Sequence, residues 1–464
     1  MNDRKTSADV LISGAKIVTM DRDRRIFNDG AVAISGCEIS AIGPSVEVCE
    51  HFESSQHIDG SRFVITPGMI NGHIHVTGDP LTRAWLPDNI EADFAEELKR
   101  WVLPRFHAHE PDDEAVSAEL AALKMLRTGT TTFLEAGTVQ YLDRVVEGAS
   151  RTGIRGRVGC WVEGRDFTDG ANQAKLIDDA IRALEAEVAA FPASDGELIA
   201  AWPILVGHST NPDEVWLAAK EIADDNGLGI SAHMSPYESD PAWFLNEHRR
   251  RPIEHLSDIG VLDRNVCLTH LAHIDESELN LLAQSGTNAV LCPLAALRGA
   301  FGISTVGRFP EMAAAGINIM LGSDGFDLDM MRQTHIVSGL FKDARRNTAV
   351  FPAEETFAML TCNGAVGLGL EQEIGSLEVG KLADFVCHDT DRPEWQPLLG
   401  VLNHLAWLAD GRSVHSVWVN GVRVIDDYQA TLIDEEALYE QARRSSRAVI
   451  SRSKLPFVSP WPVY

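Results

Sequence analysis

Several short apolar runs of the sequence end in side chains that can bind a metal ion. The run TPGMINGHIHV contains His73 and His75, and because residues two apart on a strand point to the same face, both imidazoles can reach one ion. The run GLGISAH ends at His233, and the run INIMLGSD ends at Asp324. Three imidazole nitrogens and one carboxylate oxygen, with an open coordination position, are typical of a catalytic divalent ion.

Two further histidines follow apolar runs in the same way. His208 follows LVG and His270 follows VCLT, so five of the eight strands predicted below end in a metal-competent side chain, in a chain of sixteen histidines. A single histidine or aspartate after a strand is more often a turn or cap residue, and one HxH motif alone is weak. The coincidence of five such strand ends favours an enzyme, with His208 and His270 left to contact the substrate.

The middle of the chain alternates between apolar strands and amphipathic helices. Eight strands are predicted, at residues 63–70, 128–136, 153–162, 198–207, 227–233, 265–271, 287–293 and 317–324. Helices are predicted between most of them, for example at 112–129, 174–191 and 212–227. This alternation predicts an α/β fold, a (β/α)8 TIM-like barrel, with an open doubly wound sheet as the alternative. In such a barrel catalytic groups gather at the carboxyl ends of the strands.

Both ends of the chain have β texture instead. Short alternating runs such as DVLISGAKIVTM near the start and SVHSVWVNGVRVIDD near the end are separated by turn residues, and the Asn-Gly pair in the second predicts a hairpin. We therefore predict a small β-sandwich domain composed of residues 1–66 and 375–430. The barrel is expected at 67–374, and a C-terminal helix and tail at 431–464.

Composition narrows the function classes. The 464 residues carry a formal net charge of −28, which argues against binding to nucleic acid or to an anionic membrane. The seven cysteines form no CxxC pair, a pattern suited to a reducing cytoplasm. The N-terminus MNDRKTSADV lacks the apolar core of a signal peptide, and no run approaches the roughly 20 apolar residues of a membrane span. A soluble, cytoplasmic protein is expected.

Five stretches along the chain resemble one family. They are TPGMINGHIHV, LKMLRTGTTTF, RPIEHLSDIGVLDRNVCLTHLAHID, LGSDG and IGSLEVGKLADFVCHD. Together they resemble the amidohydrolase superfamily, in the branch that contains the atrazine chlorohydrolases, guanine deaminase and S-adenosylhomocysteine deaminase. The resemblance runs along nearly the whole chain and implies a metal-dependent hydrolase with a small-molecule substrate. Relatives of this kind are often dimers or tetramers, so a homo-oligomer is expected.

The resemblance also implies roles for the strand-end residues. One divalent ion, with Zn²⁺ as the first choice and Fe²⁺, Mn²⁺ or Co²⁺ as alternatives, would be held by His73, His75, His233 and Asp324. The ion would lower the pKa of its water toward neutrality, and Asp324 would accept the proton and pass it to the leaving nitrogen. His270 would polarise the substrate carbonyl, and His208 matches a family position that contacts substrate.

A second ion is less expected. The third and fourth strands end in WVEGRD and LVGHST, so neither offers the carbamylated lysine that bridges two metals in other branches. Glu135 and Glu163, both near strand ends, keep a second ion open. A binding protein on the same scaffold is a third hypothesis, which the retention of all four ligands and His270 disfavours.

The sequence departs from the family pattern after His233. The deaminases of this branch usually have glutamate three residues later, where it protonates a ring nitrogen, but here Pro236 stands there and the first acid is Glu238. The family's Cys-Pro-Thr-Ser-Asn is replaced by CPLAA at residues 292–296. Lost polar partners would leave a polar heterocycle unpaired, at about 1–3 kcal/mol per group. We therefore expect hydrolysis of an amide, urea or carbamate C–N bond in a fairly apolar small molecule.

The alternative is an aminohydrolase (deaminase) of an N-heterocycle such as a purine, pterin or triazine, in which Glu238 replaces the missing acid. Trp85 and His273 are further candidates for substrate contact. Trp85 could instead cover the barrel mouth, and His273 could be an ordinary core residue. His255 in RPIEHL is likewise either a supporting residue or part of the core.

Overall fold

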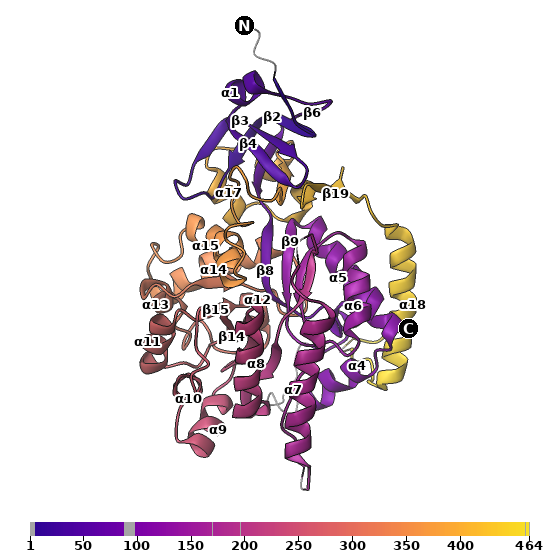
Figure 1. The fold of residues 1–464 in the computed structure, drawn as a ribbon, viewed down its shortest axis with the longest axis vertical. Coiled ribbons are helices and arrows are strands. Elements are labelled where there is room, and N and C mark those ends of the chain that lie inside the picture. The colour runs from indigo at the N-terminus through magenta and orange to yellow at the C-terminus, as the bar shows by residue number, and fades with distance from the viewer. Residues whose placement is uncertain (1–4, 88–97, 169, 195, 460, 464) are drawn as a thin grey trace.

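The computed structural model describes residues 5–87, 98–168, 170–194, 196–459 and 461–463. Two parallel sheets lie at its centre (Figure 1). The first has the order β11-β10-β9-β8, with β8 (Met69–Ile74), β9 (Thr130–Glu135), β10 (Arg155–Val158) and β11 (Ile199–Ala201). The second follows chain order, with β12 (Ile204–Gly207), β13 (Ile230–Met234), β14 (Val266–His270), β15 (Asn288–Leu291) and β16 (Ile319–Leu321).

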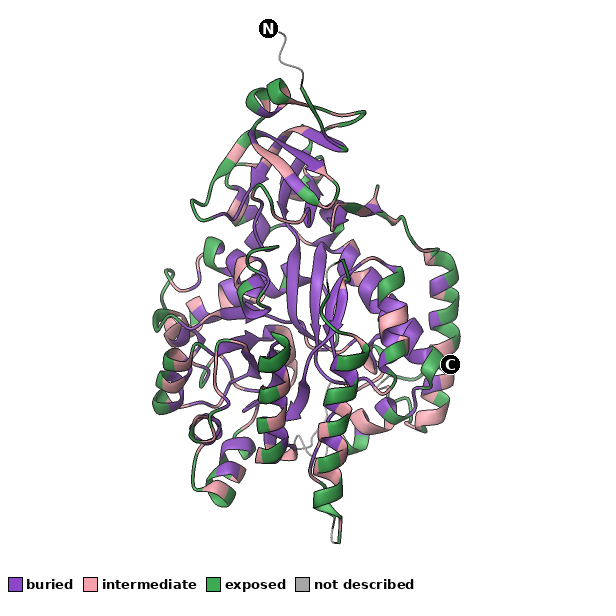
Figure 2. Ribbon diagram, viewed as in Figure 1, coloured by how far each residue is buried: buried purple, intermediate pink, exposed green. Residues whose placement is uncertain are grey.

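Helices alternate with these strands and cover them, so that the strands are buried while the outer faces of the helices are exposed (Figure 2). Those that follow the strands are α2 (Asp79–Thr82), α4 (Leu103–His107), α5 (Pro111–Arg127), α6 (Leu142–Arg151), α7 (Gln173–Ala190), α8 (Asp213–Asn226), α9 (Ser239–His248), α10 (Pro252–Asp258), α11 (Glu276–Ser285), α12 (Pro293–Arg298), α13 (Phe309–Ala314), α14 (Met330–Arg345), α15 (Ala353–Leu360) and α16 (Cys362–Gly367). The remaining helices are α1 (Ser45–His51), α17 (Val401–Trp407) and α18 (Glu435–Ser453), with a π-helical turn at Leu98–Val102 and 3₁₀ turns at His208–Thr210, Pro393–Trp395 and Gly411–Ser413. Across the described ranges, none of the helices has the length and apolarity that a bilayer crossing requires.

The predicted strands 63–70 and 198–207 are each divided in two. Phe63–Pro67 forms β7 of the terminal sheet, and the chain turns at Gly68 before β8 begins. A Cβ atom at Gly68 would lie 2.1 Å from Oγ1 of Thr131, so glycine is required for this close passage past β9. Likewise Trp202 and Pro203 separate β11 from β12, because proline lacks the N–H that continues a ladder. The three helices predicted at 112–129, 174–191 and 212–227 are observed as α5, α7 and α8.

The two ends of the chain form a single nine-stranded sheet. Its order is β20-β19-β18-β17-β7-β2-β3-β4, with β6 beside β2, and a separate two-stranded pair joins β1 (Thr6–Ser7) to β5 (Phe52–Glu53). The other strands are β2 (Val10–Val18), β3 (Ile26–Ser35), β4 (Glu38–Pro44), β6 (Gln56–Asp59), β17 (Phe385–Asp389), β18 (Val414–Val419), β19 (Val422–Asp426) and β20 (Gln429–Ala430). The antiparallel pairing of β7 with β17 connects the N-terminal strands to the C-terminal ones. The predicted hairpin is confirmed, with Asn420 and Gly421 at φ 52° and 77° between β18 and β19.

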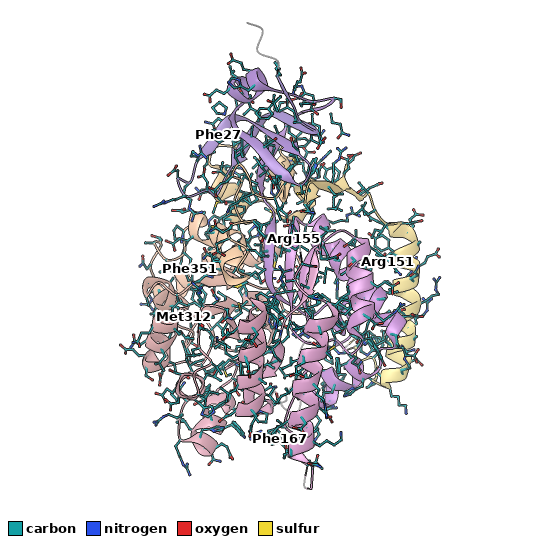
Figure 3. All side chains as sticks on the ribbon, viewed as in Figure 1. Phe27, Arg151, Arg155, Phe167, Met312 and Phe351 are labelled. Atoms are coloured by element: carbon teal, nitrogen blue, oxygen red, sulfur yellow. The ribbon has the colours of Figure 1, made fainter. Side chains whose placement is uncertain are left out.

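The terminal sheet lies at one end of the parallel strands. Because β7 leads directly into β8, this is the end at which β8 begins (Figure 1). A buried ion pair crosses the junction: Arg155 of β10, labelled in Figure 3, lies 3.2 Å from the carboxylate of Asp384. The backbone N–H of Asn420 also donates to Asp384. The carboxyl ends of the parallel strands, with their histidines, therefore face away from the terminal sheet.

Candidate metal centre

The structure brings six of the predicted site residues together, named here the histidine group: His73, His75, His208, His233, His270 and Asp324. His73 lies within β8 and His75 just beyond it, His233 and His270 lie in β13 and β14, and His208 directly follows β12. Asp324 comes three residues after β16, where its backbone N–H donates to the His73 carbonyl at 2.8 Å and a parallel bridge joins it to Ile74. The ring centroids of His73 are 5.2 Å from His75, 4.7 Å from His233 and 5.6 Å from His270. His208 lies 5.7 Å from His233.

Hydrogen bonds fix the orientation of two of these rings. Nδ1 of His233 donates to the Val206 carbonyl at 2.8 Å, so its Nε2 carries the lone pair. Nδ1 of His73 is hydrogen-bonded to the Thr269 hydroxyl at 2.9 Å. Nε2 of His73 is buried and has no hydrogen-bond partner among the described residues. Buried polar atoms usually have a partner, so this nitrogen is suited to bind a metal ion. The hydrogen bond at Nδ1 orients the ring so that Nε2 faces the place where the ion would lie.

Asp324 faces two of the histidines. Its Oδ1 is 3.1 Å from Nε2 of His75, and its Oδ2 is 3.9 Å from Nε2 of His270. Burial favours a neutral carboxyl, but the hydrogen bond and charge of His75 outweigh it, so the pKa of Asp324 lies well below its usual range. The carboxylate therefore stays ionised and can accept protons or bind a cation.

Burial keeps three of the imidazoles neutral. It lowers the pKa values of His73 and His233 well below the ordinary value and that of His270 to about 4. Neutral imidazoles offer lone pairs to a cation. One nitrogen from each of these three residues lies within 4.8 Å of the others, and the same holds for ligand atoms of His73, Cys292 and Asp324. The set of neutral nitrogens around an ionised carboxylate fits a divalent transition ion.

Three of the site residues have a backbone conformation that side chains other than glycine rarely adopt. The φ angles of His208, Asp324 and His270 are 52°, 58° and 81°. Gly207 precedes His208, and a Cβ there would lie 2.1 Å from the His233 carbonyl oxygen, so the strand ends approach closely. Such strain is retained where surrounding structure enforces it, most often at functional sites.

Sequence reasoning missed two residues of this centre. Asp240, the second residue of α9, turns back toward the strands: its Oδ2 accepts from Nδ1 of His208 at 3.0 Å and from the Ser235 N–H at 2.7 Å. Cys292 directly follows β15, and its buried thiol belongs to the group with His73 and Asp324. Burial raises the pKa of this thiol well above its usual value, so it stays neutral.

Four candidates have their observed contacts or exposure away from the clustered histidines. Glu238 is exposed at the start of α9. The ring of Trp85 packs against Phe457 of the C-terminal tail at 5.0 Å. His273 donates from Nε2 to the Phe301 carbonyl at 3.0 Å, and Glu163 is half-buried with its pKa raised by burial.

Glu135 is close to the centre but is already satisfied. Its carboxylate accepts from the N–H groups of Gly137 and Thr138 and from the Thr138 hydroxyl, which is also bonded to Nδ1 of His75. Burial raises the pKa of Glu135. The residue thus braces the ring of His75 through Thr138.

Aromatic rings line the side of the centre next to His270. The rings of Phe301 and His270 pack edge to face with their centroids 5.2 Å apart, and the centroids of Tyr237 and Phe301 are 4.7 Å apart. Tyr237 follows Pro236 in the turn between β13 and α9. These two rings, one of which carries the Tyr237 hydroxyl, form an aromatic wall on the side of His270.

A buried glutamate behind β9 makes stability depend on pH. Burial raises the pKa of Glu114 in α5 to about 7, although it accepts from the N–H groups of Gln140 and Tyr141. In the unfolded chain this carboxyl has its ordinary pKa of 4.5, so the folded state is increasingly disfavoured between pH 4.5 and 7, by about 3 kcal/mol in total. We expect Glu114→Gln to remove this loss. The difference in free energy of unfolding between the variant and the parent chain should therefore favour the variant more at pH 8 than at pH 5. Urea unfolding at both pH values measures it; Glu221→Gln, on an exposed face of α8, should show no such difference.

Comparisons with known proteins find one family and several enzymes that are similar to this chain. The amidohydrolase family profile matches residues 64–424. The chain is 28% identical over 457 residues to a 5-methylthioadenosine/S-adenosylhomocysteine deaminase of Syntrophobacter fumaroxidans, covering 95% of this chain and 98% of that one. An adenosine deaminase from Xanthomonas campestris with bound zinc has a TM-score of 0.86 at 25% identity, covering 97% and 100%. An atrazine chlorohydrolase from Arthrobacter aurescens TC1 complexed with zinc has a TM-score of 0.83 at 21% identity, covering 94% and 100%.

The family match extends over far more than half of the 464 residues and includes every residue of the histidine group. The resemblance seen in the motifs is confirmed. The chain belongs to the amidohydrolase family.

Proposed function

We propose that this chain hydrolyses a C–N bond at the carbonyl of an amide, urea or carbamate in a small, fairly apolar molecule, at a single divalent ion. Membership of the amidohydrolase family makes the chain a hydrolytic enzyme. The observation that carries the finer proposal is the turn after His233, where Pro236 is buried and Glu238 is exposed. Neither can protonate a ring nitrogen at the centre.

The residues that would hold the ion are His73, His75, His233 and Asp324. The buried, unpartnered Nε2 of His73 and the lone pair of His233 support this assignment. When bound, such an ion makes a water nucleophile available at neutral pH by lowering the pKa of that water. Zinc is the first choice because two solved relatives are described with zinc, whereas the donor set also suits iron, manganese or cobalt.

The chain's own side chains would supply the proton transfers. Asp324, held ionised, accepts the proton of the attacking water and delivers it to the leaving nitrogen. His270 is neutral, so its remaining N–H can donate to the substrate oxygen as negative charge develops there. His208, oriented by Asp240, would contact the substrate from the side of β12.

The polarity of the wall favours a carbonyl substrate. Phe301 and Tyr237 stand beside His270, and the residues after Cys292 are Pro293, Leu294 and Ala295. A ring nitrogen that faced Phe301, Leu294 or Ala295 would find no hydrogen-bonding side chain there, at a cost of about 1–3 kcal/mol. A carbonyl carbon needs only the oxygen contact that His270 offers.

A substrate panel tests the proposal. The zinc-loaded protein is assayed against anilides, phenylureas and carbamates beside aminopurines, pterins and aminotriazines. Release of an amine from the carbonyl compounds is expected. Ammonia release from the heterocycles alone would contradict the proposal.

Deamination of an N-heterocycle is the second candidate, and the relatives favour it. The Syntrophobacter fumaroxidans relative and the Xanthomonas campestris structure are both described as deaminases of adenosine-type compounds. For this reaction the chain would need an acid to replace the missing glutamate. Asp240 is the acid that turns toward the strands, and its Oδ2 accepts hydrogen bonds from His208 and Ser235.

A pair of variants two residues apart separates these roles. Asp240→Asn is expected to lower kcat/KM about 10-fold or more without loss of metal, because His208 loses a charged acceptor that fixes its ring. Glu238→Gln, at the exposed start of the same helix, is expected to leave kcat/KM unchanged. Steady-state kinetics and metal content of both proteins measure this. A loss in Glu238→Gln that exceeds the loss in Asp240→Asn would favour the deaminase.

For the architecture, we propose that the two parallel sheets are parts of one (β/α)8 barrel at residues 67–374. The bridge between Ile74 and Asp324 at one edge, and the short connection from β11 to β12 at the other, support closure. The terminal sheet, with its own apolar core, would be the small sandwich domain of residues 1–66 and 375–430, followed by the helix and tail of 431–464. Assembly as a homo-oligomer stays a prediction.

A further inference from the structure

A second group of metal-competent side chains lies outside the histidine centre. Asp213 begins α8, His248 ends α9 and His255 lies in α10. One ligand atom from each lies within 4.8 Å of the other two. Nε2 of His255 is 2.8 Å from Oδ1 of Asp213, and the centroids of the two imidazole rings are 3.9 Å apart. These three residues, named here the helix-end group, share no member with the centre described above.

Aromatic rings shield the helix-end group on one side. Trp243 and Phe244 of α9 each lie 5.5 Å from the ring of His248, and Phe244 lies 5.8 Å from His255. His255 is buried, whereas His248 and Asp213 are half-buried. The group lies at the end of the molecule away from the terminal sheet, where Figure 1 places α9 and Figure 3 labels Phe167, whose ring contacts Trp243. A water-poor wall on one side and an opening on the other suit a small cation that enters from solvent.

We propose that Asp213, His248 and His255 bind a second divalent transition ion of the zinc type, which ties α8, α9 and α10 together. Two imidazole nitrogens and one carboxylate oxygen are a ligand set for zinc, cobalt, nickel or copper rather than for magnesium or calcium, which prefer oxygen ligands. Water would complete the coordination, because the chain supplies three ligands.

The charges around the helix-end group support a cation more than an ordinary ion pair. Burial and the neighbouring His255 lower the pKa of His248, which favours the neutral ring that offers a lone pair. Asp213 adds negative charge at the group, and Glu247 adds more beside His248. Arg165, which packs over Trp243, opposes a cation here. A simple salt bridge would account for His255 and Asp213 but not for the second imidazole, which packs against the first at a tilt of 34°.

The proposed ion would stabilise the part of the chain that follows His233. The carboxylate of Asp240, the second residue of α9, is held by His208 and Ser235, and the last residue of α9 is His248. Holding that last residue against α8 and α10 restricts α9 at both ends. Because the folded chain alone assembles the three ligands, binding is expected to raise the melting temperature by about 2 °C or more at saturating metal.

Metal counting tests the proposal on the full chain. The protein is loaded with one equivalent of zinc, then equilibrated with rising free zinc up to about 100 times the protein concentration, and bound zinc is measured by mass spectrometry after dialysis. Two equivalents are expected for the parent chain and one for His248→Gln. His51→Gln, at an exposed histidine of α1, is the matched control and should bind two. The second equivalent should raise the melting temperature of the parent chain and of His51→Gln, but not that of His248→Gln.

Copper gives an independent readout of the ligands. With the centre filled by zinc, one added equivalent of Cu²⁺ should show nitrogen couplings in its electron paramagnetic resonance spectrum, and Asp213→Asn should weaken its binding about 10-fold or more. A single equivalent of bound zinc at every zinc concentration would overturn the proposal. His248 and His255 would then be two imidazoles that pack together without an ion. Two equivalents in His248→Gln would also overturn it, because the second ion would then lie elsewhere. Hydrolysis supported by the first equivalent does not enter either result.

Discussion

Asp324→Asn is expected to lower kcat by about 10³-fold while the bound metal is retained. The amide oxygen of asparagine occupies the same place as one carboxylate oxygen and can still meet a cation, but the amide cannot accept the proton of the attacking water. The effect should be large because the structure keeps Asp324 ionised, with its pKa well below the ordinary value through the hydrogen bond from His75. The free carboxylate is thus available across the physiological range.

Asp327→Asn is the control for this variant. Asp327 lies three residues further along the same loop, where its carboxylate pairs with Arg332. Its replacement should leave kcat within about two-fold of the parent chain, since its carboxylate is engaged by Arg332 and by the backbone N–H of Asp329. Rate and metal content of both variants are measured on the best substrate of the panel. A kcat of Asp324→Asn within 10-fold of the parent value, with metal bound, would assign the proton transfer to another group.

His233→Gln should remove the central ion and with it about 10³-fold or more of kcat/KM, equivalent to about 4 kcal/mol. The Val206 carbonyl fixes the ring of His233 so that its Nε2 faces His73 and His75, and glutamine has no nitrogen lone pair to place there. The bound zinc should fall by one equivalent relative to the parent chain. His51→Gln, in α1 near the N-terminus and far from His233 in the sequence, should retain both zinc and activity. Normal zinc and normal rate in His233→Gln would exclude this residue from the ligand set.

The positions of the strand-end histidines could be predicted from local pattern alone. A histidine after a run of buried apolar residues has little freedom of placement, because the strand determines where its last side chain points. The same rule applies to Cys292, which directly follows β15, but the sequence alone does not predict that its thiol lies beside His73 and Asp324. The division of two predicted strands at Gly68 and at Pro203 depended on contacts with other strands, which a single run does not reveal.

In the turn after His233, the local sequence does not predict which acid lies near the strands. Glu238 was the first acid in the sequence and the expected substitute for the missing glutamate, yet it points to solvent. Asp240 returns to the strands because the Ser235 N–H and the His208 ring both donate to it, and one of these donors comes from a strand more than thirty residues away in sequence. A carboxylate placed by such distant partners carries no signature in its own neighbourhood. The same is true of the helix-end group, whose members come from three separate helices.

Removal and return of the metal test whether hydrolysis depends on one divalent ion at the histidine centre. The parent chain is treated with a chelator, dialysed, and given zinc in fractions of an equivalent, and hydrolysis of the best carbonyl substrate of the panel is measured at each step. We expect no detectable hydrolysis without metal and a rate that rises with zinc and levels off at one equivalent, before the second equivalent raises the melting temperature. Full activity in protein that holds less than about one-tenth of an equivalent of any divalent metal would contradict this expectation.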